Sequence, residues 1–299
     1  MPACILDTGI PIIDTHQHLW DLDLIPLSWV SPPLDRSFIT EDYLEAVKGQ
    51  NVTKSIYMEV GAPAEYRDKE TEWALELCKN PDNPTVGAVI AADPTAREFQ
   101  SYMGKMAGNP YLKGIRYSFR TSEELLLPQV IGSIRFLGKI GLSFDLNLKP
   151  ELLNIGGQLL DACPETRFVL NHCGNADPVA FLAEHDAVPR DSHHDADQWY
   201  RNIELLAQRD NVICKISGLV DNVPDYPLNA SNLAPIINHC FEAFGSDRLL
   251  FAGDWPVCLR NMPLALWIET LKQVVASRSL VDQRKLFHDN AYSFYGLTD

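Results

Sequence analysis

Long apolar stretches are missing from this chain. No run reaches the roughly 18–20 apolar residues that a membrane-spanning helix requires. The first seven residues, Met-Pro-Ala-Cys-Ile-Leu-Asp, also lack the basic segment and apolar core that are typical of a signal peptide. We therefore expect a cytoplasmic protein that does not enter a membrane.

Basic residues are scarce relative to acidic ones. The chain of 299 residues has 25 Lys and Arg against 40 Asp and Glu, which gives a formal net charge of −15. A protein with this charge repels phosphate groups, so nucleic acids and anionic membranes are poor candidate partners. The expected partner is a small-molecule substrate. The oligomeric state is open, with a homodimer as the assembly considered.

Two kinds of local motif are also absent. The seven cysteines are scattered and form no Cys-x-x-Cys pair, so we expect buried thiols rather than a disulfide framework or a zinc ribbon. No Gly-x-Gly-x-x-Gly follows the first apolar run, and there is no P-loop. This absence argues against a doubly wound nucleotide-binding sheet, which is the main alternative for a chain of alternating strands and helices.

What the chain does contain is a regular alternation of short apolar, β-branched runs with helix-like segments. Many of the runs are continuously apolar, as expected for parallel strands that are buried on both faces. We predict one domain over residues 1–299, a single (β/α)8 TIM barrel. The expected strands are roughly Ile10–Thr15, Val52–Val60, Thr85–Ala91, Leu112–Tyr117, Leu142–Leu148, Arg167–Asn171, Val212–Ser217 and Leu249–Gly253.

The ends of these strands carry the strongest candidates for chemistry, because a TIM barrel places its active site there. His16 and His18 are two residues apart on an extended chain, so both side chains point the same way and could bind one divalent metal. His172 follows the sixth strand, and Asp254 follows the eighth. A carboxylate in this position can act as a general base. The alternative for the histidines is an ordinary place in the core or on the surface.

Four further polar residues lie at or near strand ends. Glu59 lies in an apolar run, where a carboxylate needs a metal, an arginine or a hydrogen-bond network. Arg116 suits a substrate carbonyl or carboxylate, or a salt bridge to Glu59 or Asp145. Asn147 could hydrogen-bond a substrate. Lys215 lies inside a strand, so it needs an acidic partner if it is buried, and it is a candidate for substrate binding.

Aromatic residues just beyond the strand ends could form an apolar platform for a sugar ring, with core packing as the alternative for each. Candidates for this role are Trp20, Trp29, Tyr117 and Trp255. Trp29 belongs to a long loop over residues 20–39 that follows the first strand and is expected to lie over the active face.

An ordered set of short motifs runs through the chain and resembles one known family. The motifs are I-D-T-H-Q-H-L-W at 13–20, K-G-I-R at 113–116, N-H-C-G at 171–174, W-Y at 199–200, C-K-I-S-G-L at 214–219, F-A-G-D-W-P at 251–256 and N-A-Y-S-F-Y at 290–295. Together they resemble the amidohydrolase superfamily, in particular its sugar-lactonase-like branch of metal-dependent TIM-barrel hydrolases. That branch includes lactonases for L-fuconolactone, L-rhamnonolactone and a pyrone dicarboxylate.

The resemblance implies roles for individual residues. His16 and His18 correspond to the metal-ligand pair of the first strand, His172 to the active-site histidine after the sixth, and Asp254 to the aspartate that takes a proton from water. The chain departs from the wider superfamily in two places. Arg116 and Tyr117 occupy the region of the bridging Lys or Glu, and Asn147 or its neighbours replace the usual histidine.

These departures lead us to expect one divalent metal at most, with zinc as the first choice. His16, His18 and Asp254 would hold it, Glu59 could complete the set, and the metal could also be weakly bound or dispensable. The branch includes members thought to work without metal.

The expected function is hydrolysis of a sugar-derived lactone. In this hypothesis Asp254 deprotonates a water and the resulting hydroxide attacks the lactone carbonyl. The oxyanion is stabilised by a metal where one is bound, and otherwise by donors such as His172 or Arg116. Two alternatives stay open: a metal-dependent non-oxidative decarboxylase or hydratase of an aromatic or muconate acid, and a catalytically inactive barrel that only binds.

Overall fold

The computed structural model describes residues 9–182, 190–221, 223 and 226–298. Its central element is an eight-stranded parallel sheet in which each strand pairs with the next along the chain. The strands are β1 (Ile12–Gln17), β2 (Val52–Met58), β3 (Thr85–Ala91), β4 (Leu112–Arg116), β5 (Ser143–Leu146), β6 (Arg167–Leu170), β7 (Val212–Ile216) and β8 (Leu249–Phe251).

The sheet curls until its first and last strands meet, which makes it a TIM barrel. Gln17 forms a parallel bridge with Trp255, just beyond β8. The Thr15 hydroxyl donates to the Phe251 carbonyl at 2.7 Å, and the backbone N–H of Asp254 donates to the His16 carbonyl at 2.9 Å. This closure places the carboxyl ends of β1 and β8 side by side.

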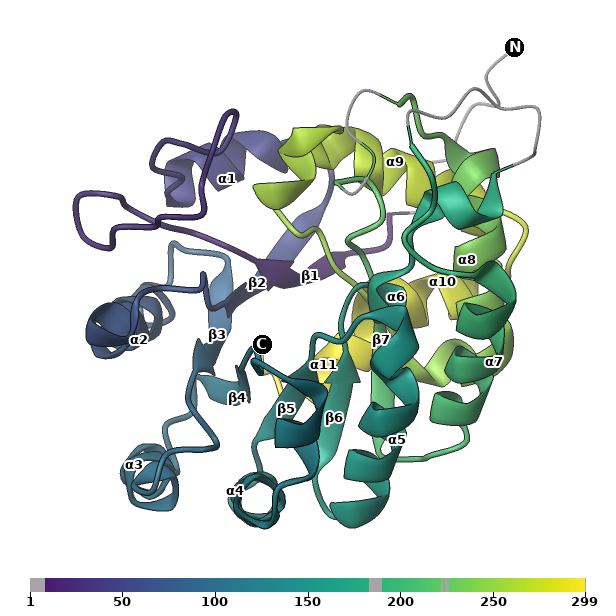
Figure 1. Ribbon diagram of the computed structural model, residues 1–299. Helices are drawn as coiled ribbons and strands as arrows, with labels where there is room; N and C mark the ends of the chain where they lie inside the picture. Colours follow the sequence, from purple (N-terminus) through teal and green to yellow (C-terminus); the bar gives the residue numbers. More distant parts are fainter. Residues whose placement is uncertain (1–8, 183–189, 222, 224–225, 299) are drawn as a thin grey trace.

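Helices surround the strands (Figure 1). They are α1 (Thr40–Ala46), α2 (Arg67–Leu77), α3 (Phe99–Met106), α4 (Pro128–Lys139), α5 (Leu153–Ala162), α6 (His172–Asn175), α7 (Ala196–Ala207), α8 (Ala230–Phe244), α9 (Leu264–Val275), α10 (Leu280–Arg284) and α11 (Asn290–Phe294). Shorter turns include 3-10 segments at Ala64–Tyr66, Ser122–Leu126, Pro150–Leu152, Pro178–Phe181, Ser246–Arg248 and Val257–Arg260, and a π-helical turn at Lys285–Asp289. Within the described residues, no helix is both long and apolar enough to cross a membrane.

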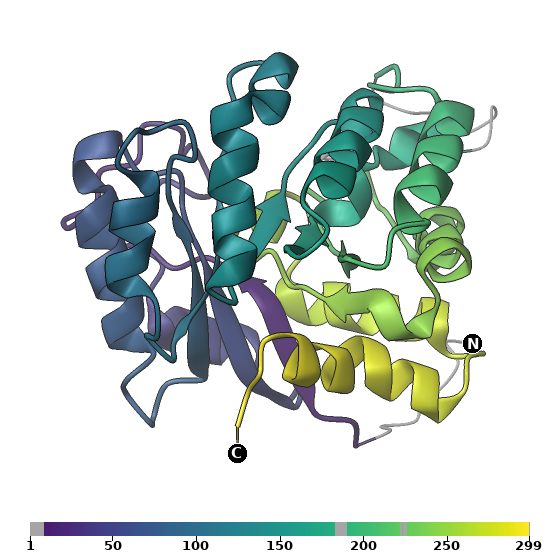
Figure 2. The same ribbon diagram turned by 90° about the horizontal axis from the view of Figure 1, so that it is seen from below.

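The apolar core has two parts. The larger part fills the layer between strands and helices. The smaller part joins strand residues such as Ile13, Val169 and Leu250 to Tyr295 and Leu297 near the C-terminus. The C-terminal helices lie beside the beginning of β1 (Figure 2), so they cover the end of the barrel opposite the predicted active face.

The expected strands all exist, and most of them end one or two residues earlier than expected. The six described cysteines are free and buried, as expected, and Cys4 lies outside the described residues. The long loop after β1 does reach the active face, where it supplies Trp29 to the pocket described below.

Candidate active site

His16, His18 and Asp254 converge at the carboxyl ends of β1 and β8. The two Nε2 atoms of the histidines are 3.1 Å apart, and Asp254 Oδ1 lies 3.4 Å from His16 Nε2 and 3.5 Å from His18 Nε2. His18 Nδ1 is 3.0 Å from the carbonyl oxygen of Met58. A hydrogen bond donated by Nδ1 to that carbonyl would leave Nε2 without a proton and able to bind a metal, the tautomer found in metal-binding histidines.

A buried carboxylate, Asp14, joins the two strand ends behind these side chains. Its Oδ1 accepts hydrogen bonds from the backbone N–H groups of His16 at 3.0 Å and Gly253 at 2.7 Å, and its Oδ2 accepts one from the Tyr43 hydroxyl at 2.9 Å. A Cβ atom on Gly253 would lie 2.4 Å from Asp14 Oδ2, so only glycine fits there. Asp14 therefore fixes the backbone on which His16 and Asp254 are mounted.

His172 approaches the same carboxylate from β6. Its backbone has a positive φ of 54°, followed by 52° at Cys173 and 67° at Gly174, so the chain turns sharply as soon as the strand ends. The His172 Nδ1 atom is 3.0 Å from Ser217 Oγ and 4.0 Å from Asp254 Oδ2. The two oxygens of Asp254 thus face different histidines: Oδ1 faces the β1 pair, and Oδ2 faces His172.

The surroundings hold these groups in complementary charge states. Burial raises the pKa of Asp254, but the neighbouring His172 and His18 outweigh burial and bring it to about 2. Burial lowers the pKa of His172 to about 4, although Asp254 opposes that shift. Burial, helped by the charge of Lys215, also holds the pKa of His16 well below its usual value. At neutral pH the site therefore presents an ionised carboxylate and neutral imidazoles at positions 16 and 172, the forms that bind a metal.

Glu59 and Arg116 form a buried ion pair beside the histidines. Arg116 Nε donates to Glu59 Oε1 at 2.5 Å, and Arg116 Nη2 donates to the Glu59 carbonyl at 2.8 Å. The second carboxylate oxygen of Glu59 accepts from the Gly61 N–H at 2.7 Å. Both oxygens are therefore engaged, and Glu59 is not part of the group whose ligand atoms converge. In this structure Glu59 pairs with Arg116 instead of joining His16, His18 and Asp254, and its role as a metal ligand stays a prediction.

These side chains lie around a pocket of about 290 Å³, at the small end of ligand-binding cavities. Of the predicted site residues it contains His18, Glu59, Arg116, Asn147, His172 and Asp254. Asn147 lies exposed at the mouth, where its side-chain oxygen accepts a hydrogen bond from Asn175 at 2.8 Å.

Four predicted substrate contacts lie elsewhere. Trp20 and Trp255 are core residues, at 0% and 2% exposure, and both pack against Phe38. The side chain of Tyr117 packs against Phe119 and is not among the pocket residues, because the next residue along a strand points to the opposite face from Arg116. Trp20 and Trp255 are therefore packing residues, and Tyr117, which is partly buried, lies outside the pocket.

Lys215 is the fourth of these residues. Its Nζ donates to Asp145 Oδ2 at 2.8 Å, and both side chains are fully buried. It lies beneath the pocket and not in its wall. Trp29 is the aromatic residue of the predicted set that does line the pocket, with its indole N–H donating to the Val60 carbonyl at 2.8 Å.

The sequence analysis of the strand ends did not identify three residues that contribute to the site. Asp14 belongs to the same short motif as His16 and His18, so its position was visible in the sequence although its role was not. Ser217 is the residue directly after β7 and contacts His172. Asp221 lies in the loop after β7 and lines the pocket; burial, helped by the charge of Asp254, raises its pKa to about 8.

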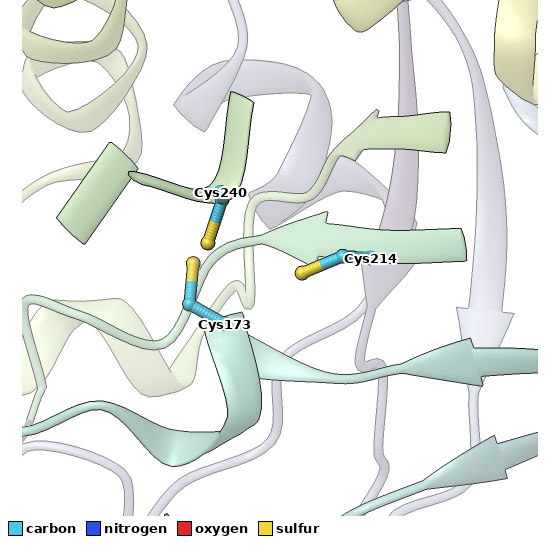
Figure 3. Close-up of side chains that lie close together, drawn as sticks. All are labelled: Cys173, Cys214 and Cys240. Atoms are coloured by element: carbon cyan, nitrogen blue, oxygen red, sulfur yellow. The ribbon is translucent and has the colours of Figure 1, made fainter. Parts of the chain in front are cut away.

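A second group of potential metal ligands lies behind His172. The described residues contain two sets of three His, Cys, Asp or Glu side chains whose ligand atoms all lie within 4.8 Å of one another: His16, His18 and Asp254, and Cys173, Cys214 and Cys240. Cys173 and Cys240 point toward each other, and Cys214 reaches toward them from β7 (Figure 3). All three cysteines are fully buried, and none of them lines the pocket.

Comparison with known proteins adds a family profile and several relatives. The profile described as Amidohydrolase matches residues 13–297. The chain is similar to the L-fucono-1,5-lactonase of Burkholderia multivorans, with 26% identity over 83% of this chain and 82% of that protein. It is also similar to the L-rhamnono-gamma-lactonase of Scheffersomyces stipitis, with 22% identity over 96% and 98% of the two chains.

A solved structure shares the fold. It is an amidohydrolase from Burkholderia multivorans with bound zinc, with a TM-score of 0.81 and 23% identity. The match covers 96% of this chain and 100% of that one.

Proposed function

The chain belongs to the amidohydrolase family, and from this premise we propose that it hydrolyses the ring ester of a sugar-derived lactone. The observation that carries the proposal is the position of Asp254, whose two carboxylate oxygens face the His16–His18 pair and His172 respectively. The names of two relatives, an L-fuconolactonase and an L-rhamnonolactonase, support the choice of a lactone over other esters and amides.

The side chains present suit a single zinc ion. Two imidazole nitrogens and one carboxylate oxygen are ligands that zinc prefers, and a catalytic zinc site keeps a position open for water or substrate. His16, His18 and Asp254 would hold the ion through His16 Nε2, His18 Nε2 and Asp254 Oδ1, which already lie within 3.5 Å of one another. When bound, such an ion supplies Lewis-acid chemistry: it lowers the pKa of water and polarises a carbonyl group.

The protein's own groups account for the proton transfers. Asp254 takes a proton from water as the water oxygen attacks the lactone carbonyl carbon, and the electron pair of the C=O bond moves to the carbonyl oxygen. When that pair returns, the bond from carbon to ring oxygen breaks. Asp254 then returns its proton to the ring oxygen, so the product is an open-chain hydroxy acid and the carboxylate is regenerated. His172 and the Arg116 Nη1 group are suitable hydrogen-bond donors to the oxyanion.

The alternatives fit the site less well. A decarboxylase or hydratase of an aromatic or muconate acid requires a cation for the substrate carboxylate, and the positive charge of Arg116 is balanced by its ion pair with Glu59. A barrel that only binds would not need to retain a polar cluster. Here His16, His18, His172 and Asp254 all surround one buried point.

A pH-indicator assay tests the proposal directly. The panel contains L- and D-aldono-1,4- and 1,5-lactones of five and six carbons, each measured with added zinc and again after treatment with a chelator. We expect acid release above the background rate for one sugar series. The chelator measurements show whether turnover needs the metal. No hydrolysis under either condition would contradict the proposal, and aromatic and muconate acids would then be tested.

A further inference from the structure

A further carboxyl group, that of Asp221, faces the same pocket and has no part in the chemistry above. Asp221 follows β7 and lines the pocket together with Asp254 and His172. Its Oδ1 atom is buried and has no hydrogen-bond partner among the described residues. Buried polar atoms in native proteins are almost always paired, and those left unpaired need an explanation.

The pocket offers few positive charges to balance this group. Of the described residues that line it, the acidic and basic ones are Glu59, Arg116, Asp221 and Asp254. The single cation, Arg116, is held by Glu59. Lys215 lies beneath the pocket and is paired with Asp145. A substrate that carries its own carboxylates would therefore meet the ionised carboxylate of Asp254 and no free cation among these residues.

A hydroxyl-rich neutral substrate would meet the opposite situation. Each sugar hydroxyl is a hydrogen-bond donor, and a carboxyl oxygen with a free lone pair is a strong acceptor. The pocket volume of about 290 Å³ suits a single small ring. We infer that Asp221 binds hydroxyl groups of the substrate and so selects a neutral, polyhydroxylated lactone over an unsubstituted lactone or one that carries carboxylates. This inference rests on the proposed function.

The expected energetic pattern separates this role from a structural one. Removing a side chain that serves the fold lowers the stability of the protein, whereas removing one that is kept for a ligand does not. We expect Asp221→Ala to leave the melting temperature unchanged or to raise it. The same variant should lose affinity only for ligands with hydroxyl groups, because a site built to bind a hydroxyl discriminates strongly through that contact.

The experiment compares the wild type, Asp221→Ala, Asp221→Asn and a matched control, Asp210→Ala. Asp210 is an exposed acid just before β7, so its replacement removes a carboxyl group at the other end of the same strand, away from the pocket. The probes are the aldonolactone panel, unsubstituted δ-valerolactone and γ-butyrolactone, and 2-pyrone-4,6-dicarboxylate. We expect Asp221→Ala to lower kcat/KM for the best aldonolactone by roughly 10- to 100-fold. It should change kcat/KM for the unsubstituted lactones by less than about threefold. Asp221→Asn keeps an acceptor oxygen, so its kcat/KM for the best aldonolactone should lie between the values of the wild type and Asp221→Ala.

An equal loss on hydroxylated and unsubstituted lactones, or no loss on either, would overturn the inference. So would a wild type that prefers the dicarboxylate. Calorimetric binding of the corresponding sugar lactams, which resist hydrolysis, separates this inference from the proposed function. If the lactams bind in a manner that depends on Asp221 while no lactone is opened, the binding role stands and the proposed function fails. If the lactones are opened and neither binding nor turnover depends on Asp221, the proposed function stands and the inference fails.

Discussion

The two groups of potential metal ligands in this molecule have similar spacing and different surroundings. In the histidine group, two of three side chains, those of His18 and Asp254, line the pocket, and its carboxylate is ionised at neutral pH. In the cysteine group all three sulfurs are fully enclosed. Burial raises the pKa of the Cys214 thiol well above its usual value, whereas at Cys173 burial is outweighed by hydrogen bonds with Cys214 and Cys240, which hold the pKa of that thiol well below its usual value. The spacing of ligand atoms alone therefore does not define a site, and access from the pocket distinguishes the two groups.

The boundary between the two environments runs between consecutive residues. His172 lines the pocket, whereas the Cys173 thiol points the other way and contacts the Lys215 carbonyl at 3.6 Å. The left-handed backbone at both residues makes this turn possible. We expect substitutions on the pocket side to change activity and substitutions on the thiol side to change stability.

The largest expected effect is that of Asp254→Asn. An amide cannot take a proton from water, so we expect kcat to fall by about 10³-fold, within the range that general acid–base groups supply. The measurement is turnover of the best aldonolactone, with Asp210→Asn as a control that removes an equal charge far from the pocket. Full turnover by Asp254→Asn would show that another group is the base.

The second largest expected effect concerns zinc, which should bind to the histidine group and not to the cysteine group. We expect about one zinc per chain after incubation with zinc and dialysis, with affinity at least tenfold weaker in His18→Asn and unchanged in Cys240→Ala. Elemental analysis and competition with a chromophoric chelator measure both quantities. Zinc that stays in His18→Asn and leaves in Cys240→Ala would reverse the assignment of the two groups.

Substitutions in the cysteine group should change the stability of the protein rather than its activity. Cys240→Ser places a hydroxyl among enclosed sulfurs, and we expect a loss of about 1–3 kcal/mol in the free energy of unfolding. We expect kcat/KM to stay within about twofold. Urea denaturation is the measurement. Cys78→Ser is the matched control: its thiol already donates to the Ala74 carbonyl at 3.2 Å, so a hydroxyl there keeps a partner and should cost less. Similar losses at both positions would argue against a special environment at Cys240.

Much of the barrel and of the catalytic cluster could be predicted from the sequence, because both depend on local patterns. Continuous apolar runs predict the strands, and a polar residue at the end of such a run faces the pocket in a barrel. His16, His18, His172 and Asp254 all meet this condition and come together in the structure.

The rest depends on contacts between distant residues and on loop paths. The salt bridge between Arg116 and Glu59, 57 positions apart, was one of two that the sequence suggested for Arg116, and the structure selects it. The pairing of Lys215 with Asp145, 70 positions away, becomes visible only in three dimensions. The sequence did suggest that these residues need partners. Trp20 and Trp29 belong to one loop, and no periodicity indicates that Trp20 enters the core while Trp29 reaches the pocket. Asp221 lies beyond Gly218, whose positive φ redirects the chain.

The smallest expected effect extends the comparison to a carboxyl group of the scaffold. Glu70 lies in α2, where its Oε1 accepts from the Tyr57 hydroxyl at 3.0 Å and from the Val60 N–H at 2.6 Å. Burial, helped by the charge of Glu59, raises the pKa of Glu70 from 4.5 to about 7, whereas Asp254 is ionised by its neighbours. Between pH 4.5 and about 7, the Glu70 carboxyl group keeps a proton in the folded protein that the same group has lost in the unfolded chain. Its contribution to stability is therefore fully present below pH 4.5 and declines as the pH rises to about 7.

Glu70→Gln removes this titration and keeps the accepting oxygen. We expect the free energy of unfolding of the wild type, relative to Glu70→Gln, to fall by at most about 1 kcal/mol per pH unit between pH 5 and 7 and to level off above that range. Urea denaturation at several pH values measures this difference, and any constant cost of the amide cancels from its slope. Other titrating groups affect both proteins alike. A difference that rises with pH, or stays flat, would show that Glu70 is ionised in the folded protein, and the contrast with Asp254 would then not hold.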